Sequence, residues 1–239
     1  MRPPAGWLVE TRTGTTSALH EDWPDPGRRA VRILSRCEPA GPPALVVGSA
    51  QDADVADAEE LARTGTTLVR RRTGGGAVAV AAGDQLWVEA WIPAADALWD
   101  ADVVRGAFWL GDVWAGALAR LGVGGVEVHR GRAVGGRWAS VLCFAGRGPG
   151  EVFVEGRKLV GLAQRRTAAG TRLSSMAVVD WRPARLLELL RLTDAERADA
   201  GAGLAHTVTG LTGLLPGAGD MPAAVDGVFD AVVAELPSA

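Results

Sequence analysis

One segment constrains the fold more than any other part of this 239-residue chain. In residues 151–166, two apolar runs flank the short polar stretch Glu155, Gly156 and Arg157. This pattern predicts two antiparallel strands joined by a tight turn, because a short turn that contains glycine reverses the chain in a hairpin. The return strand begins at Lys158, which is the one lysine among 25 Lys and Arg residues.

The single lysine indicates a specific need for an ammonium group at this place. Every other basic side chain of the Lys/Arg type is arginine. An ammonium is a compact charge whose protonation responds to burial, whereas a guanidinium is planar and stays charged. We therefore expect Lys158 to serve a purpose that arginine cannot serve; the alternative is a lysine left at a random position.

Cys143 lies 15 residues before Lys158, across a Gly- and Pro-rich loop at residues 145–150. A loop in front of a hairpin can fold this cysteine back toward the lysine. A nearby ammonium favours the thiolate, which is the nucleophilic form of cysteine. The alternative interpretation is that Cys143 is a small buried apolar residue within the run Val-Leu-Cys-Phe.

A second motif is the glycine run Gly74, Gly75 and Gly76, which follows a predicted strand and three arginines. Glycines let the backbone approach a ligand closely and direct N–H groups toward an anion or a carbonyl. The adjoining arginines can bind a carboxylate or phosphate in a fork. The alternative interpretation is a flexible turn beside a solvated basic run.

Hydrophobic periodicity predicts one α/β (α+β) domain with a mixed, mostly antiparallel sheet flanked by helices. Residues 1–30 are predicted to be an irregular N-terminal segment, and residues 31–239 the domain. Strands are expected at residues 31–34, 44–47, 67–70, 85–92, 126–128, 140–144, 151–155, 158–163 and 176–180. Helices are expected at residues 52–62, 103–121 and 183–192. A capping box at Thr193 begins a further short helix, and the last helix begins at residue 220, after a Gly/Leu-rich connection at 201–219.

Composition excludes several classes of protein. The formal net charge of −3 does not suit a nucleic-acid surface, and no apolar stretch is long enough for a membrane span. The first residues lack the apolar core of a signal peptide, and two cysteines make no disulfide framework. The three histidines have no metal-ligand spacing. We expect a cytoplasmic protein that binds no metal, nucleic acid or membrane.

Together, the two motifs resemble those of the lipoate and octanoate protein ligases and transferases, which share a catalytic domain with biotin protein ligase. Residues 70–78 resemble the family's Arg-Arg-x-Ser/Thr-Gly-Gly-Gly/Arg-Ala-Val loop, and residues 156–164 its Gly-Arg-Lys-x-x-Gly-x-Ala-Gln strand. Residues 43–51 are similar to its upstream strand and turn. The resemblance implies the biotin/lipoate protein ligase catalytic fold, with an acyl chain bound beside the glycine loop.

The resemblance also implies roles for individual residues. Lys158 matches the lysine that contacts the acyl carbonyl or acyl phosphate. The residues that match the acyl- and adenylate-binding segments are Arg71, Thr73, Gly74, Gly75, Gly76, Gly161 and Ala163. Leu86, Trp87 and Val88 are candidates to line the acyl tunnel.

The family contains two chemistries, and the sequence favours one of them. Cysteine-dependent octanoyltransferases and amidotransferases carry a Cys-Phe pair before the lysine, which Cys143 and Phe144 match. ATP-dependent ligases carry an Arg-Asn-Asp motif before the hairpin, which residues 146–151 lack, although the whole chain has no Asn. Two other family motifs also differ: residues 79–82 replace a His-Asp, and residues 171–175 replace a Gln-His-Gly.

The resemblance therefore predicts an acyltransferase with Cys143 and Lys158 as catalytic residues. An octanoyl-acyl carrier protein or an acylated lipoyl domain is the expected donor, and no cofactor is required. The expected acceptor is a lysine of an apo lipoyl domain, as in the glycine cleavage H protein or a 2-oxoacid dehydrogenase E2. One alternative is a lipoate-protein ligase that uses ATP and Mg, with Cys143 structural; another is a non-catalytic paralogue that binds lipoyl or acyl groups.

Overall fold

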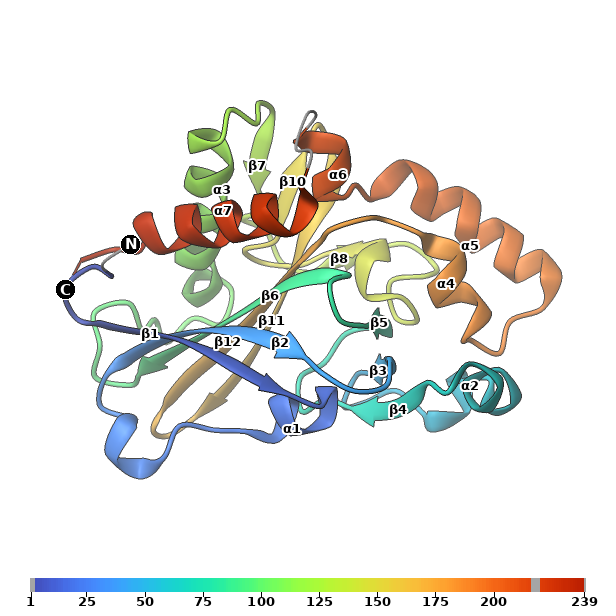
Figure 1. Cartoon of the computed structure of the whole chain (residues 1–239), viewed down its shortest axis with the longest axis horizontal. Helices are drawn as coiled ribbons and strands as arrows, with labels where there is room; N and C mark the ends of the chain where they lie inside the picture. Colours follow the sequence, from blue (N-terminus) through green and yellow to red (C-terminus); the bar gives the residue numbers. More distant parts are fainter. Residues whose placement is uncertain (1–2, 216–219, 239) are drawn as a thin grey trace.

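A computed structural model describes residues 3–215 and 220–238 of the chain. Its centre is a seven-stranded sheet in the order β1-β2-β6-β12-β11-β10-β7 (Figure 1). All neighbouring strands of this sheet are antiparallel except β1 and β2, which are parallel. The strands are β1 (Trp7–Gly14), β2 (Arg32–Pro39), β6 (Gln85–Pro93), β7 (Val126–Val128), β10 (Val152–Val154), β11 (Arg157–Thr167) and β12 (Gly170–Val178). The predicted fold class is confirmed.

The predicted hairpin is present as β10 and β11. Val154 pairs with Arg157 across a two-residue turn. Both turn residues have positive φ angles, 49° at Glu155 and 76° at Gly156. This is the twist that suits a two-residue connection between antiparallel strands. The turn places Lys158 at the start of a central strand, with its side chain buried.

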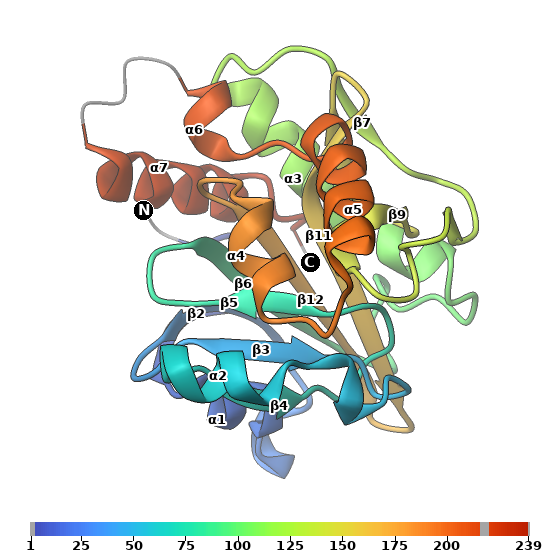
Figure 2. The ribbon, with the colours of Figure 1, turned by 90° about the vertical axis from the view of Figure 1, so that its right-hand side faces the viewer.

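One face of the sheet packs against α3 (Phe108–Arg120) and α7 (Met221–Ala234), which lie side by side in both views (Figures 1 and 2). The short turn η3 (Arg105–Ala107) leads into α3. Trp114 of α3 is fully buried and donates from its Nε1 to Ser175 Oγ of β12 at 3.0 Å. The predicted helix at residues 103–121 is thus confirmed, although it begins five residues later.

The other face is covered by a small sheet in the order β4-β3-β5. Its strands are β3 (Ala44–Val47), β4 (Thr67–Arg70) and β5 (Val78–Val80). Figure 2 shows β3 and β4 at the bottom of the view, with α4 (Pro183–Glu188) and α5 (Asp194–Thr207) above them. Trp87 of β6 belongs to the apolar cluster between the two sheets and is fully buried. The two sheets therefore enclose a second core, and its edge is where the site forms.

The prediction that residues 1–30 are irregular is wrong for much of that segment. Residues Trp7–Gly14 form β1, which pairs with β2 along its full length. A short helix, α1 (Thr16–Glu21), and a turn, η1 (Pro26–Arg28), follow. The sequence of β1 lacks a clear apolar alternation because it is an edge strand whose polar side chains bind those of neighbouring strands.

Three further segments differ from their predictions. Residues 140–144 are not a strand: a turn, η4 (Cys143–Ala145), follows a single bridge between Ala77 and Leu142. The predicted helix at 52–62 is split into η2 (Ala53–Val55) and α2 (Ala58–Thr64). The predicted connection at 201–219 instead contains the end of α5 and α6 (Leu211–Leu214), while its residues 216–219 lie outside the described residues.

The remaining pieces are two short strands, β8 (Val134–Gly135) and β9 (Gly146–Arg147), which pair with each other. The capping box predicted at Thr193 is present at the start of α5. Within the described residues, no helix has the length and apolar character needed to cross a membrane.

Candidate active site

Two adjoining pockets lie between the glycine loop, the Cys143 turn and β11. The more polar pocket, of about 460 Å³, is lined by the glycine loop, by the β8–β9 segment and by Lys158. The apolar pocket, of about 40 Å³, extends between the two sheets. Cys143, Leu162 and Ala163 border both pockets. Each of the nine site residues expected from the sequence lines at least one pocket: Arg71, Thr73, Gly74, Gly75, Gly76, Cys143, Lys158, Gly161 and Ala163.

The glycine loop is held in place by its own arginine. Arg71 is buried and donates from Nη2 to the carbonyl oxygens of Gly74 at 2.8 Å and Gly76 at 2.7 Å. These hydrogen bonds from the Arg71 guanidinium fix the shape of the glycine loop. Arg71 also lines the apolar pocket. At Gly76 a Cβ atom would lie 2.5 Å from the backbone of Leu142, so only glycine fits there.

The Cys143 turn is joined directly to that loop. The N–H of Cys143 donates to the carbonyl of Ala77 at 3.0 Å, and the N–H of Ala77 donates to the carbonyl of Val141 at 2.7 Å. The amide of Gln51 adds hydrogen bonds to the carbonyls of Ser140 and Val141. Cys143 is half-buried, at the boundary of the two pockets. These backbone contacts fix the position of a thiol that both pockets share.

Lys158 is almost fully buried, and its ammonium has three oxygen partners. Nζ lies 2.6 Å from Oε1 of Glu151, and it donates to the carbonyls of Cys143 at 2.9 Å and Gly146 at 3.2 Å. Nζ also lies 5.2 Å from the centroid of the Phe144 ring, within the range of a cation–π contact. The ammonium is therefore held against the turn that carries the cysteine through the backbone carbonyl of Cys143.

The apolar pocket is small. Its apolar lining comprises Val78, Phe144, Leu162 and Met176. A cavity of about 40 Å³ has room for only a few water molecules, so an octanoyl or lipoyl chain would need lining side chains to move in order to enter it. Met176 suits this role because a thioether chain has three rotatable bonds and fills gaps of variable shape.

Two residues of the site are not predicted from the sequence as site residues. Glu151 binds the ammonium of Lys158 and also accepts from the N–H of Gly148 at 2.6 Å. His20 reaches the apolar pocket from α1, in the segment predicted to be irregular. Glu151 could have been suspected because a buried lysine needs a counter-charge; no pattern near His20 points to the site.

The predicted acyl-lining residues of β6 are only partly supported. Leu86 and Val88 face the opposite core, which packs against α3 and α7, so the prediction is wrong for both. Successive side chains of a strand point to opposite faces, and only Trp87 faces the site. Its Nε1 donates at 3.0 Å to Ser174 Oγ, and Ser174 lines the apolar pocket. Trp87 thus forms a layer behind the pocket.

The comparison with protein families decides the identity of the domain. Residues 35–236 match the model of the lipoyl protein ligase A/B catalytic domain. The chain belongs to this family. Members are enzymes of lipoate-protein ligase or transferase type, so the resemblance inferred from the two motifs is confirmed. No protein in a search of curated proteins matches the chain.

Solved structures of lipoate-protein ligases share the fold. One is a bipartite lipoate protein ligase of Thermoplasma acidophilum, studied with its E2 lipoyl domain, with a TM-score of 0.70 and 16% identity. The match covers 97% of this chain and 82% of that one. Another is lipoate-protein ligase A bound with ATP, with a TM-score of 0.66, 18% identity, and coverage of 97% and 83%. At these identities the similarity establishes the fold alone.

Proposed function

We propose that the protein is an acyltransferase that carries an octanoyl or lipoyl group on Cys143 and delivers it to a lysine of a lipoyl domain. The observation that carries this proposal is the position of Cys143 at the boundary of the two pockets, on a turn held by Lys158. A thioester on this sulfur would have its carbonyl beside the polar pocket and its hydrocarbon tail in the apolar one. Neither the donor nor the mechanism requires a cofactor.

The reaction divides into two balanced steps. In the first, the sulfur of Cys143 attacks the acyl carbonyl of the donor and a new C–S bond forms. The C–S bond of a carrier-protein thioester, or the C–N bond of an acylated lipoyl-domain lysine, breaks, and the carrier leaves as a thiol or an amine after taking up the proton of Cys143. In the second, the acceptor amine attacks the Cys143 thioester, an amide bond forms, and the amine's proton returns to the sulfur. Covalent catalysis of this kind replaces one difficult transfer with two easier ones.

Lys158 contributes a fixed positive charge to both steps. Its ammonium is held by Glu151 and by the carbonyl of Cys143 itself. A cation in this place stabilises the negative charge that develops on the sulfur and on the carbonyl oxygen of the tetrahedral intermediate. Because its contacts anchor the turn, Lys158 also acts as a positioning residue for the sulfur.

A carrier domain is the acceptor that best fits the site and the family. A similar archaeal ligase was studied with its E2 lipoyl domain, so we extend that acceptor class to this chain. The polar pocket opens beside the exposed Val134 on β8, which gives a carrier's lysine a route to the thioester. An octanoyl-acyl carrier protein or an acylated lipoyl domain is the proposed donor.

One observation favours a second function, an ATP-dependent lipoate-protein ligase. The polar pocket, at about 460 Å³, exceeds what an acyl carbonyl needs, and glycine-loop N–H groups and Lys158 border it. A ligase of similar fold has been solved with ATP bound. In that case ATP and magnesium would activate free acid, and Cys143 would serve only in packing.

The test is the intact mass of the purified protein after it is mixed with octanoyl-carrier protein in the absence of ATP. We expect an octanoyl adduct on wild type and on Cys37→Ser, and none on Cys143→Ser. Cys37 is the matched control because it is the other cysteine, is buried, and lines neither pocket. Burial, with the nearby charge of Glu89, raises the pKa of its thiol to about 12 and keeps it protonated.

The alternatives give different results in the same experiment. No adduct, with acylation of a lipoyl domain only when free acid, ATP and magnesium are added, would replace the transferase with the ligase. Binding of the acyl group without transfer under either condition would make the protein a non-catalytic binder. An adduct that persists in Cys143→Ser would overturn the assignment of the nucleophile.

A further inference from the structure

His20 occupies an unusual position for a polar side chain. It lines the apolar pocket together with Val78, Phe144 and Met176, and it is only 9% exposed. Its imidazole packs on the indole of Trp87, with ring centroids 4.5 Å apart. Within residues 3–215 and 220–238, its buried Nε2 has no hydrogen-bond partner. Most buried polar atoms in folded proteins have a hydrogen-bond partner, so an unpartnered nitrogen beside a pocket is a candidate to bind a ligand.

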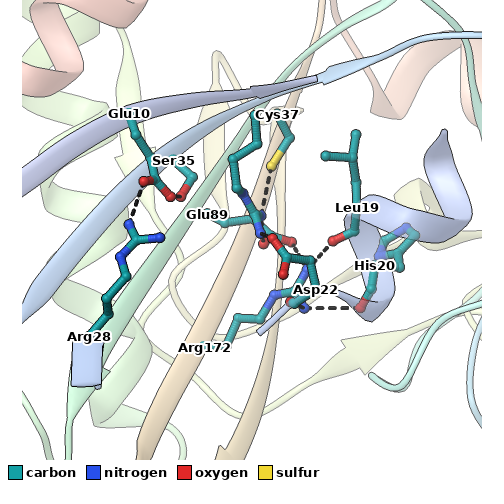
Figure 3. Close-up of polar contacts among 10 residues, drawn as sticks. Glu10, Leu19, His20, Asp22, Arg28, Ser35, Cys37, Glu89 and Arg172 are labelled. Atoms are coloured by element: carbon teal, nitrogen blue, oxygen red, sulfur yellow. Dashed lines mark hydrogen bonds and ion pairs between the residues drawn. The ribbon is translucent and has the colours of Figure 1, made fainter. Parts of the chain in front are cut away.

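The backbone of His20 is held firmly by a network outside the pocket (Figure 3). Arg172 donates to the carbonyls of Leu19 at 2.8 Å, His20 at 3.0 Å and Asp22 at 2.8 Å. Glu89, itself buried, pairs with both Arg172 and Arg12. Figure 3 shows the His20 imidazole directed away from the Arg172 guanidinium. The end of α1 is thus anchored, which keeps the ring at the pocket.

The ring is neutral at physiological pH. Burial, together with the charges of Arg172 and Arg71, lowers the pKa of His20 to about 3. A neutral imidazole has one N–H donor and one acceptor nitrogen, so Nε2 can take part in one weak hydrogen bond with a ligand. A charged partner would not suit a pocket whose walls are mostly apolar.

The direction of the acyl chain places its tail near His20. Gly74, Gly75, Gly76 and Lys158 line the polar pocket, whereas His20 lines only the apolar one. An acyl group on Cys143, as in the proposed function, would have its carbonyl at the boundary of the two pockets and its hydrocarbon chain in the apolar pocket. His20 is therefore a neighbour of the chain and lies away from the reacting carbonyl.

We propose that His20 is a specificity-determining residue that selects an acyl tail carrying sulfur, so that the site prefers a lipoyl to an octanoyl group. The inference rests on the proposed function, since it concerns the acyl group that Cys143 accepts. A dithiolane sulfur is a weak acceptor that suits both an apolar pocket and a single N–H donor. An octanoyl tail is hydrocarbon to its end and leaves Nε2 buried without a partner, which carries a penalty.

The test is a competition between lipoyl- and octanoyl-carrier protein at equal concentration, read as the two adduct masses on the enzyme. We expect wild type to favour the lipoyl adduct by about tenfold, the scale of one buried hydrogen bond. His20→Leu should reduce the ratio to about one, while His20→Gln, which retains a donor, should keep part of the preference. The matched control is His206→Leu, because His206 is an exposed histidine of α5 outside both pockets.

Parallel titrations with free lipoate and free octanoate, followed by tryptophan fluorescence, separate this inference from the proposed function. Adducts with the same ratio in wild type and His20→Leu would overturn the role of His20 and leave the transferase intact. If no adduct forms with either donor, the transferase proposal fails. The ratio of the Kd for free octanoate to the Kd for free lipoate then decides the role of His20. A ratio unchanged by His20→Leu would then reject that role, and a lipoate preference lost only in that variant would support it.

Discussion

At the scale of single residues, Lys158 shows how a composition clue becomes a physical constraint. The side chain is the only lysine of the chain, and its ammonium lies in the interior with Glu151 at 2.6 Å. Burial of a charge is costly unless the charge is paired and hydrogen-bonded. The ion pair with Glu151 therefore offsets the cost of burying the Lys158 ammonium. The other N–H groups of the ammonium bind the carbonyls of Cys143 and Gly146, in the turn that carries the cysteine.

This pairing predicts strong coupling between the two residues. Lys158→Met should lower the free energy of unfolding by about 3–5 kcal/mol, because it leaves the Glu151 carboxylate buried without its cation. Glu151→Gln alone should also destabilise the protein, but the double variant should be more stable than the sum of the single effects predicts. Urea unfolding of the four proteins gives the coupling energy. Additive effects would show that the two charges do not stabilise each other.

At the scale of elements, the glycine loop and the Cys143 turn form one unit. They are segments more than sixty residues apart in the sequence, joined by the backbone bridge between Ala77 and Leu142. The bridge brings the two chains so close that residue 76 has no room for a side chain. The triple-glycine run therefore contains positions with different requirements, which the sequence alone does not separate.

We predict that Gly76→Ala and Gly74→Ala have very different effects. A Cβ at residue 76 would lie 2.5 Å from the backbone of Leu142, whereas one at residue 74 meets no atom of the described residues within 4 Å. Gly76→Ala should cost about 1–3 kcal/mol of stability, the usual range for overpacking, and reduce acyl transfer because the Cys143 turn shifts. Gly74→Ala should stay within about 0.5 kcal/mol of wild type. Thermal unfolding and the transfer rate test this; equal effects would contradict a close approach specific to residue 76.

At the scale of the whole molecule, the buried network around Arg172 connects parts of the chain that the sequence separates widely. Arg172 lies on β12 in the centre of the sheet, and it binds the backbone of α1 near the N-terminus. Glu89 of β6 holds Arg172 and also Arg12 of β1. Through these contacts the edge of the sheet and α1 depend on the central strands.

Arg172→Met should therefore release α1 from the sheet. We expect a loss of about 3–5 kcal/mol, since Glu89 loses one of its cations in a buried place and three backbone carbonyls lose their donor. Amide hydrogen exchange should show faster exchange in α1 than in α7. Arg185→Met is the matched control: its partner is Asp84 in an exposed pair, which is worth at most about 1 kcal/mol. Unchanged exchange in α1 would mean that the helix is held by its apolar contacts alone.

The sequence by itself determined the parts of this protein that depend on neighbouring residues. Apolar spacing and turn chemistry predicted the β10–β11 hairpin, the strands at residues 44–47, 67–70 and 126–128, and the capping box at Thr193. These features are local, because a turn or a cap is built from residues a few positions apart. The two motifs likewise identified the family and the residues that gather at the pockets.

The tertiary structure decided what depends on long-range contact. Tertiary contacts pair Lys158 with Glu151 and place His20 beside the apolar pocket. They also make an edge strand, β1, of part of the N-terminal segment that the sequence predicts to be irregular. The sequence around β1 shows no strong pattern because an edge strand gains its stability from the neighbouring strand and from ion pairs across it. The residues that complete the site likewise come from distant segments, and only the packing of two sheets brings them together.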